Sequence, residues 1–491
     1  MHIFETLPDV ALYPESLVEQ EESTYGLART SEGKRLLVRG DTRGFEGHPH
    51  PEDPTTLLCP LNATNAATLR TRLAWLNPRP LGLARSFGLG DRLGMATPGH
   101  IRALRACPDI SPIFAQQSMR ENARTGRTPQ QVVDEAMWGV FQAGWREPWG
   151  ADADHLKTTV HIDACVAAGY TFFTFDPGDH VDNTAHTAPL ADLQARFTAL
   201  PWNTLNDSPQ ALRRRYLDRT FTAEDYQITF SEAALLRAAG KYGHTLAHVA
   251  VLFQHLTKAM QTRPFDLEIS VDETETPTSP LEHFFIASEL RRLGVNWVSL
   301  APRYGGRFEK GVDYIGDLQN FEAEIARHAA IARTLGPYKL SLHSGSDKFS
   351  IYPIIARHAG ALVHVKTAGT SYLEALRAIA QVKPALFREI LALAHDRYAT
   401  DRATYHVSAD AARVPHPEDV ADDQLAGMLE QFDARQILHV TFGSVLERFG
   451  SEIKAVLAEN EATHYAVLET HFIRHLAPFC GLSNSSKEEI A

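Results

Sequence analysis

The chain has 491 residues, of which 44% are hydrophobic and 22% are charged, and its formal net charge is −12. This composition is typical of a globular protein and excludes a disordered chain. The acidic balance argues against a nucleic-acid-binding surface, which needs a concentrated basic stripe, and the one basic run, Arg213–Arg215, is better explained as a solvated helix face.

Most of the chain has the pattern of a barrel. Residues 1–78 predict an accessory N-terminal segment with one strand at Arg35–Arg39, and from residue 79 to about residue 450 short apolar runs alternate with helical patterns. Eight successive units predict an α/β fold of the (β/α)8 TIM-barrel type. Two further strand candidates, Tyr405–Ser408 and Ile437–Phe442, leave open which strand closes the barrel. The eight expected strands are Pro80–Ser86, Ser111–Gln116, Trp149–Asp154, Thr171–Phe175, Phe265–Ser270, Asn296–Leu300, Tyr338–His343 and Ala361–Lys366.

Three further segments are added to the barrel. A helical insertion is expected at about residues 177–264, and its second half, Ser231–Thr262, carries a long helical pattern. A C-terminal helix is expected over residues 451–480, followed by a polar tail over residues 481–491. No repeat of fixed period occurs, which argues against a solenoid.

The cysteines and the first residues bear on the compartment. Cys59, Cys107, Cys165 and Cys480 are widely spaced and form no CxxC pair, which predicts neither a disulfide framework nor a thiolate zinc site. Met1–Pro8 lacks the basic and apolar regions of a signal peptide, and no later window approaches the roughly 18 consecutive apolar residues of a membrane span. We therefore expect a soluble cytoplasmic protein that binds neither membrane nor nucleic acid.

Polar and charged residues gather where the expected strands end. In parallel barrels the reacting groups come from the carboxyl ends of several strands, because the loops that follow converge on one mouth. Solvated loops alone would also be polar, but they would not place His, Asp, Glu, Lys or Arg after nearly every strand. The pattern therefore predicts an active site. The strand ends are Arg85–Gly88, Gln116–Ser118, Asp152–His155, Asp176–Asp179, Glu268–Glu273, Pro302–Arg303, His343–Ser346 and Lys366–Gly369.

Two histidines are candidate metal ligands. His155 and His343 end different strands, and imidazoles together with carboxylates suit a divalent cation such as Zn, Mn, Ni or Fe. A lone strand-end histidine can equally be a hydrogen-bonding or acid/base residue. Glu309, in the glycine-rich loop Arg303–Gly311, is the candidate for the remaining ligand, with a solvated ion pair to Lys310 as the alternative.

Two carboxylates are candidate catalytic groups. Asp154 and Glu268 end different strands, as a two-sided proton transfer requires, since one group removes a proton and the other returns one. Asp152, Asp272 and Glu273 compete for these roles. Because side chains alternate with a period of two, Asp152 shares a face with Asp154 and Asp272 shares one with Glu268. We expect these neighbours to support the reacting groups.

The order of Asp154 and His155 sets a geometric condition. Adjacent residues on a strand point to opposite faces of the sheet. Both side chains can therefore serve one site only if the strand has ended by Asp154 and the chain is already turning.

Cations and hydroxyls near the mouth of an acidic chain favour an anionic substrate, either a carboxylate or a phosphate. Backbone amides and hydroxyls after His343 can bind an anion or sugar hydroxyls, with a simple strand-to-helix turn as the alternative. A Schiff base on Lys366 is a further alternative, but electrostatic binding is favoured. The candidate substrate-binding residues are Lys157, Arg303, Ser344, Ser346 and Lys366, with Lys348 nearby.

Several nucleotide motifs are missing. Gly88–Gly94 reads GxGxxxG, one residue too long for the dinucleotide fingerprint, and no P-loop or GxSxG elbow occurs. The sequence therefore supports neither a nicotinamide cofactor nor a nucleoside triphosphate.

Five long blocks carry a family resemblance. They are GADADHLKT at Gly150–Thr158, TFFTFDP at Thr171–Pro177, YGGRFEKGVDYIGD at Tyr304–Asp317, KLSLHSGSDKFSIY at Lys339–Tyr352 and HVKTAGTSY at His364–Tyr372. Together they cover nearly the whole predicted barrel and resemble the bacterial tagaturonate epimerase family, which interconverts tagaturonate and fructuronate in hexuronate breakdown. The last residues, Gly481–Ala491, lie outside the family pattern.

The resemblance implies a divalent-metal-dependent sugar-acid epimerase on a barrel. In the matching blocks, His155 and His343 correspond to metal ligands and Asp154 to the proton acceptor, whereas Glu309 and Glu268 are completions drawn from the residues alone. The oligomeric state and the metal's identity are not indicated.

The chemistry of these sugars limits the mechanism. The two uronates differ at C4, whereas the ketone is at C2 and the carboxylate at C6, so the C4 proton is not acidified by enolisation. A retro-aldol cleavage of C3–C4, followed by rotation and re-addition, needs a metal and an acid/base group. Transient oxidation at C4 normally needs a nicotinamide, so we favour the retro-aldol route. Two other functions stay open: a metal-dependent aldolase acting on a keto sugar acid, and a non-catalytic sugar-acid binding protein.

Overall fold

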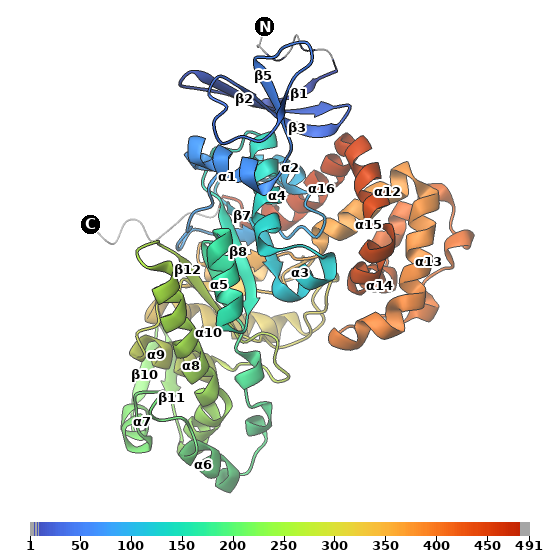
Figure 1. The fold of residues 1–491 in the computed structure, drawn as a ribbon. Coiled ribbons are helices and arrows are strands. Elements are labelled where there is room, and N and C mark those ends of the chain that lie inside the picture. Colours follow the sequence, from blue (N-terminus) through green and yellow to red (C-terminus); the bar gives the residue numbers. More distant parts are fainter. Residues whose placement is uncertain (1–3, 5–6, 8, 482–491) are drawn as a thin grey trace.

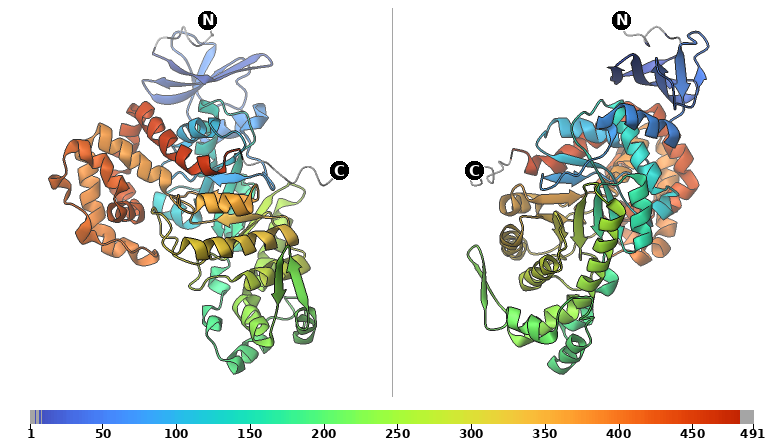
Figure 2. Two further views of the ribbon diagram at one scale, coloured as in Figure 1. Left: turned by 180° about the vertical axis from the view of Figure 1, so that it is seen from behind. Right: turned by 60° about the vertical axis from the view of Figure 1, so that its left-hand side comes forward.

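The computed structural model describes residues 4, 7 and 9–481 (Figure 1). A small antiparallel sheet and a helical insertion project from opposite ends of a central barrel, and a layer of C-terminal helices covers one side (Figures 1 and 2). The predicted polar tail lies outside the described residues except for Gly481, as does most of Met1–Pro8. None of the helices in the described part of the chain has the length and apolar character that a membrane span needs.

The N-terminal sheet has the strand order β1-β2-β3-β5-β4. The predicted strand at Arg35–Arg39 lies within β3, whose Leu36, Leu37 and Val38 are all fully buried. The strands are β1 (Ala11–Gln20), β2 (Ser23–Thr30), β3 (Gly33–Arg39), β4 (His48–Pro49) and β5 (Thr56–Cys59), and they are followed by α1 (Ala63–Arg72) and the short 3-10 helix η1 (Ala74–Leu76).

Eight parallel strands close the barrel in the order β12-β13-β14-β15-β6-β7-β8-β9, which confirms the predicted fold class. Their short apolar runs are buried on both faces, as expected for a parallel sheet covered by helices. The strands are β6 (Ser86–Gly88), β7 (Ser111–Ser118), β8 (Gly150–Leu156), β9 (Phe172–Phe175), β12 (Asp266–Ser270), β13 (Ser299–Ala301), β14 (Lys339–Leu342) and β15 (Val363–Lys366).

The first barrel strand begins later than the sequence suggests. The expected strand at Pro80–Ser86 overlaps β6 at one residue only. Pro80 has no N–H group for a strand ladder. The N–H groups of Leu81 and Gly82 donate to the Asp266 carboxylate instead, at 2.6 and 2.9 Å. This segment is therefore a turn.

Several of the helices around the barrel begin at side-chain caps. Ser118, Thr128 and Ser279 each form a capping box with an acidic or amide residue three positions later. The helices are α2 (Thr97–Arg105), α3 (Met119–Thr125), α4 (Pro129–Gln142), α5 (Thr159–Ala168), α9 (Pro280–Arg292), α10 (Leu318–Leu335), α11 (Tyr352–Ala359) and α12 (Thr370–Val382).

A helical segment separates β9 from β12. Its long helix, α8 (Glu232–Met260), confirms the helical pattern predicted at Ser231–Thr262. The segment projects away from the barrel (Figure 2). Its other elements are η2 (Gly178–His180), η3 (Asn183–His186), α6 (Leu190–Thr198), α7 (Pro209–Tyr216), β10 (Thr220–Ala223) and β11 (Tyr226–Thr229).

After β15 the described chain has helices and irregular segments but no strand, so neither extra strand candidate is a strand. Residues 405–408 are irregular, and Ile437–Val440 belongs to α14. A short apolar run cannot by itself distinguish a strand from a buried helix. The expected helix over residues 451–480 is instead two helices. The elements are α13 (Pro384–Asp401), η4 (Arg402–Thr404), η5 (Ala411–Arg413), η6 (Pro417–Asp419), η7 (Asp422–Glu430), α14 (Phe432–Val440), α15 (Phe442–Glu459), α16 (Glu461–Leu476) and η8 (Ala477–Phe479).

These C-terminal helices pack around an apolar core of their own. Leu373 and Ile379 of α12, Phe387 of α13, Leu438 of α14 and Ile453 of α15 are fully buried in it. The last barrel strand in the sequence, β15, pairs with β14 on one side and with the first barrel strand, β6, on the other. The barrel therefore closes without any later segment. How the chain divides into domains stays a prediction.

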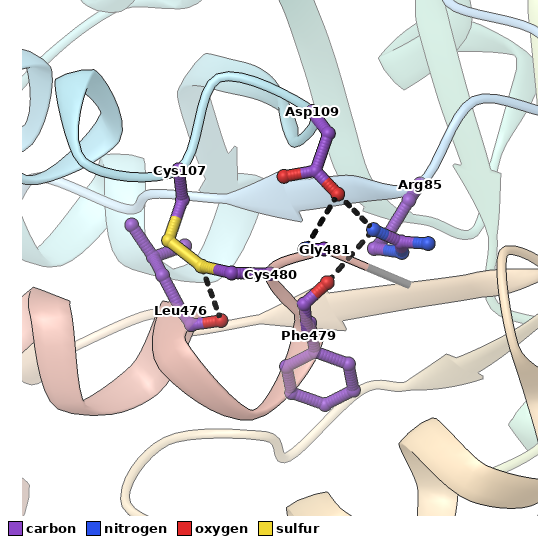
Figure 3. The surroundings of a disulfide bond; sticks show 7 residues. All are labelled: Arg85, Cys107, Asp109, Leu476, Phe479, Cys480 and Gly481. Carbon is purple, nitrogen blue, oxygen red and sulfur yellow. Dashed lines mark hydrogen bonds and ion pairs between the residues drawn. A yellow bond between two sulfur atoms is a disulfide. The ribbon is translucent and has the colours of Figure 1, made fainter. Parts of the chain in front are cut away.

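A disulfide links Cys107 to Cys480, with a Cα–Cα distance of 5.5 Å (Figure 3). The expectation that the cysteines form no disulfide was therefore wrong, because two cysteines 373 residues apart meet only in the folded chain. Cys59 and Cys165 are free and buried, and burial raises the pKa of each thiol to about 12. The disulfide holds the end of the last helix against the loop before β7 (Figure 3).

Candidate active site

A buried lysine gathers three carboxylates inside the barrel. Lys366 Nζ, at the end of β15, lies 2.8 Å from Asp152 Oδ2, 2.8 Å from Asp154 Oδ1 and 2.9 Å from Glu268 Oε1. Burial would lower the pKa of Lys366, but the three carboxylates outweigh it and raise that pKa. The amine therefore stays an ammonium, which argues against the Schiff-base alternative. Its Nζ also donates to Thr174 Oγ1 at 2.6 Å.

The three carboxylates around Lys366 differ in proton affinity. Burial raises the pKa of Asp152 to about 6, with Lys366 opposing the change. Burial also acts on Asp154 and Glu268, but Lys366 and nearby imidazoles outweigh it, lowering the pKa of Asp154 well below its ordinary value and that of Glu268 to about 2. Asp154 and Glu268 are therefore ionised at neutral pH.

His343 contacts two of the carboxylates that surround Lys366. Its Nε2 lies 2.9 Å from Asp154 Oδ1 and 3.6 Å from Glu268 Oε1. Its Nδ1 lies 2.8 Å from Asp272 Oδ1 and 3.0 Å from Ser270 Oγ. Burial would lower the pKa of His343, but Asp272 and Asp154 raise it well above its ordinary value. The His343 imidazole thus connects the two predicted catalytic carboxylates, Asp154 of β8 and Glu268 of β12.

The backbone at His155 explains how Asp154 and His155, which are adjacent in the sequence, can face one site. Strand β8 does not end at Asp154 but continues to Leu156. His155 has a positive φ of 52°, and three residue steps on β8, from Ala153 to Leu156, oppose two on β9. An extra residue of this kind is a β-bulge, which breaks the alternation of side chains. Asp154 and His155 therefore both face the same site.

The two imidazoles belong to a group of possible metal ligands. Ligand atoms of Asp154, His155 and His343 all lie within 4.8 Å of one another. His155 Nδ1 lies 2.9 Å from Asp176 Oδ2, just as the Nδ1 of His343 is held by Asp272. Metal-binding histidines usually hold a carboxylate through the second ring nitrogen, which leaves the first free for the ion. These residues therefore fit a divalent cation.

The surroundings of His155 are strongly acidic. Glu273 Oε1 lies 3.7 Å from its Nε2, so that His155, Asp176 and Glu273 form a second overlapping ligand group. Burial would lower the pKa of His155, but Glu273, Asp154 and Asp176 raise it to about 9. Such an environment attracts positive charge, whether a proton or a metal ion.

A cavity of about 340 Å³ opens beside His343. Asp272, Glu273 and Ser344 line it from the ends of β12 and β14. The loop after β13 supplies a further wall, and Tyr405 closes it from the C-terminal helical layer. A volume of this size suits a small molecule such as a sugar acid.

The structure does not bring Glu309 to the two histidines. Its carboxylate accepts hydrogen bonds from Ser408 Oγ at 2.7 Å and from Gln436 Nε2 at 2.9 Å, and it lies 3.3 Å from Arg307. The alternative, an ion pair with Lys310, is not formed either. Glu309 therefore fastens its loop to the C-terminal helices.

The candidate substrate-binding residues are scattered. Arg303 and Ser344 line the cavity. Lys157 lies outside it and pairs with Asp179 at 2.9 Å. The Ser346 hydroxyl is buried and donates to Ala368 O at 3.3 Å. Lys366 lies beneath the site, held by the carboxylates already described.

Some site residues were not assigned roles from the sequence. Asp176 holds His155, and Gln116 Nε2 donates to Asp154 Oδ2 at 3.0 Å. Both residues are at expected strand ends, and this position was the signal in the sequence that could have identified them as site residues. Asp272, expected only to support Glu268, instead orients His343.

A second group of possible ligands lies between the loop after β14 and the C-terminal helices. Asp347, His471 and His475 are all buried and have ligand atoms within 4.8 Å of one another. The Arg435 guanidinium lies 2.9 Å from Asp347 Oδ1, so a cation already occupies this position. The group links α16 and α14 to the loop after β14.

The fold and the site define an enzyme of the (β/α)8 class, with ionised carboxylates and paired imidazoles at the carboxyl ends of its strands. The family model of tagaturonate epimerases matches residues 13–479, and the chain belongs to this family.

Known relatives agree along nearly the whole chain. The tagaturonate/fructuronate epimerase of Thermotoga maritima is 44% identical over 476 residues, covering 95% of this chain and 96% of that protein. The native crystal structure of fructuronate-tagaturonate epimerase from Cohnella laeviribosi has a TM-score of 0.91 and 37% identity, covering 96% of this chain and 97% of that one. A glycerol complex of the same enzyme gives the same TM-score and identity.

Proposed function

We propose that this protein is an isomerase that interconverts D-tagaturonate and D-fructuronate at C4, with a divalent metal ion and by retro-aldol and aldol chemistry. Family membership and the name of the relative that is 44% identical support the substrates. The observation that carries the metal is the convergence of Asp154, His155 and His343, with each imidazole held by a second carboxylate. The choice among Zn, Mn, Ni and Fe is left to metal analysis.

The same three residues are our proposed metal ligands. His155 and His343 would use Nε2, and Asp154 takes the place predicted for Glu309. When bound, a divalent ion supplies Lewis-acid stabilisation of negative charge on substrate oxygens. Lys366 and Gln116 orient the Asp154 carboxylate through hydrogen bonds of 2.8 and 3.0 Å.

Glu273 is our proposed acid/base group at the C4 oxygen. It lines the cavity, its side chain is 30% exposed, and Arg120 contacts it at 3.1 Å. Glu268 cannot take this role directly, because it is fully buried and held by Ser299 Oγ at 2.6 Å. Asp154, if a ligand, is likewise unavailable. A partly exposed carboxylate has the freedom to serve the oxygen before and after the aldehyde rotates.

Isotope and trapping experiments test this route. Tagaturonate carrying deuterium at C4 should convert to fructuronate without a primary kinetic isotope effect, because the C4–H bond stays intact. Borohydride added during turnover should trap two three-carbon fragments. A primary isotope effect without fragments would instead indicate oxidation at C4, and net accumulation of free fragments would indicate an aldolase.

We also propose that the substrate is a free small molecule of hexuronate breakdown, as the family resemblance implies, and that the enzyme works in the cytoplasm. A reducing cytoplasm disfavours stable disulfides. Cell fractionation, with the thiol state of Cys107 and Cys480 measured by mass spectrometry after rapid alkylation, tests the location.

A further inference from the structure

Four cationic side chains line the cavity beside His343: Arg120, Arg303, Arg307 and Lys310. Arg120 and Arg307 each have a carboxylate partner, Glu273 at 3.1 Å and Glu309 at 3.3 Å respectively. These two charges are already balanced within the protein.

The Arg303 guanidinium donates hydrogen bonds to backbone carbonyl oxygens. Its Nη1 donates to Tyr304 O at 2.8 Å and to Gly306 O at 3.2 Å, and its Nε donates to Thr274 O at 3.4 Å. The guanidinium therefore shapes the loop after β13, which leaves it few donors for a ligand.

Lys310 differs from the other three cations. Its Nζ donates to Ser344 Oγ at 2.9 Å, and no carboxylate of the described residues lies within 4.0 Å of it. An ammonium group has three donors, and a serine hydroxyl that accepts one hydrogen bond still has its own proton to donate. Lys310 and Ser344 together present several donors to the cavity.

The loop that carries Lys310 is fixed on both sides. The buried Lys348 donates from Nζ to Glu309 O at 2.9 Å, to Val312 O at 2.5 Å and to Ser346 O at 2.8 Å. On the other side, the Glu309 carboxylate is bound by Ser408 and Gln436. Because its neighbours are held in place, Lys310 is pre-organised for a ligand, which reduces the entropy lost on binding.

Lys310 lies close to His343, because its hydrogen-bond partner Ser344 directly follows His343 in the chain. In a hexuronate only C5 separates the C6 carboxylate from C4. A group that binds the carboxylate must therefore lie close to the residues that act on C4.

We propose that Lys310, assisted by the Ser344 hydroxyl, binds the C6 carboxylate of the uronate and thereby selects uronates over neutral ketoses. This inference rests on the proposed function and names the specificity-determining residue of that same site. The alternative given by the sequence, a solvated lysine paired with Glu309, does not occur.

Steady-state kinetics of Lys310→Met test the proposal, with Arg307→Met as the matched control on the same loop. We expect Lys310→Met to raise the KM for both uronates about tenfold or more, because a charge-assisted hydrogen bond is lost, while kcat changes less than about threefold. Arg307→Met should change KM less than about threefold. Lys310→Arg should recover most of the affinity, and Ser344→Ala should give an intermediate loss.

Inhibition by a neutral sugar provides the second readout. D-tagatose lacks the carboxylate, so its inhibition constant should be the same for the wild type and Lys310→Met. An unchanged uronate KM in Lys310→Met, or an equal loss for uronate and D-tagatose, would overturn the proposal. Ser344→Ala tests the same pair if Lys310→Met does not fold. A wild-type enzyme that fails to epimerise uronates would overturn the proposed function instead.

Discussion

The imidazole rings of His155 and His343 lie with their centroids 4.4 Å apart, although the two residues come from different strands of the barrel. Each Nδ1 is held by a carboxylate, Asp176 for the first and Asp272 for the second, at 2.9 and 2.8 Å. Nε2 of His343 lies 2.9 Å from Asp154 Oδ1, and one ligand atom of each of the three residues lies within 4.8 Å of the other two. This arrangement underlies the metal-dependent mechanism proposed above.

Removing either imidazole should remove the metal. We expect His343→Gln to lower the affinity for a divalent ion by at least about tenfold and to abolish epimerisation, because losing even an outer partner of a ligand costs that much. Isothermal titration and metal analysis of the purified protein measure this. His358→Gln, whose imidazole pairs with Glu322 on α10, is the control and should bind metal as the wild type does. Full metal binding by His343→Gln would contradict the assignment.

Asp154→Asn separates a ligand from a proton acceptor. If Asp154 is a ligand, the variant loses both metal affinity and activity, and excess metal restores part of the activity. If Asp154 is the base, as the sequence predicts, the variant keeps its metal and remains inactive at any metal concentration. Glu273→Gln should show that second behaviour. Metal content and activity, measured on the same samples, distinguish the two roles.

Glu309→Gln should leave the metal in place. Because the Glu309 carboxylate is bound by Ser408 and Gln436, we expect wild-type metal content together with a lower unfolding temperature. Metal analysis and thermal denaturation check this. Loss of the metal in this variant would restore Glu309 as the third ligand.

Much of the barrel could be predicted because its strands are short apolar runs that end in charged residues. The period of two also placed Asp152 and Asp154 on the same face, where both contact Lys366. Long-range pairing was not predictable. The partner of Glu309 at Gln436 lies 127 residues away, and nothing local indicates it. The sequence required the strand to end by Asp154, but β8 continues to Leu156 and a bulge at His155 brings both side chains to the site instead. The bulge depends on pairing with the neighbouring strand, which no local pattern indicates.

Lys366 should be essential for stability as well as activity. Lys366→Met would leave three buried carboxylates without their shared cation, and breaking a buried pair costs about 3–5 kcal/mol of unfolding free energy. Denaturant unfolding of the metal-free protein measures this difference. Lys383→Met is the control, because its pairing with Glu452 at 2.6 Å is at the surface, where such pairs contribute about 0–1 kcal/mol. Equal effects of the two substitutions would contradict the central role of Lys366.

Chelation followed by metal replacement tests the central claim most directly. The purified protein is assayed for conversion of D-tagaturonate to D-fructuronate before chelation, after removal of the chelator, and after addition of Zn, Mn, Ni or Fe singly. We expect chelation to abolish activity and at least one of these ions to restore it in the wild type, but not in His343→Gln. Full activity in protein shown by analysis to be metal-free would contradict the account.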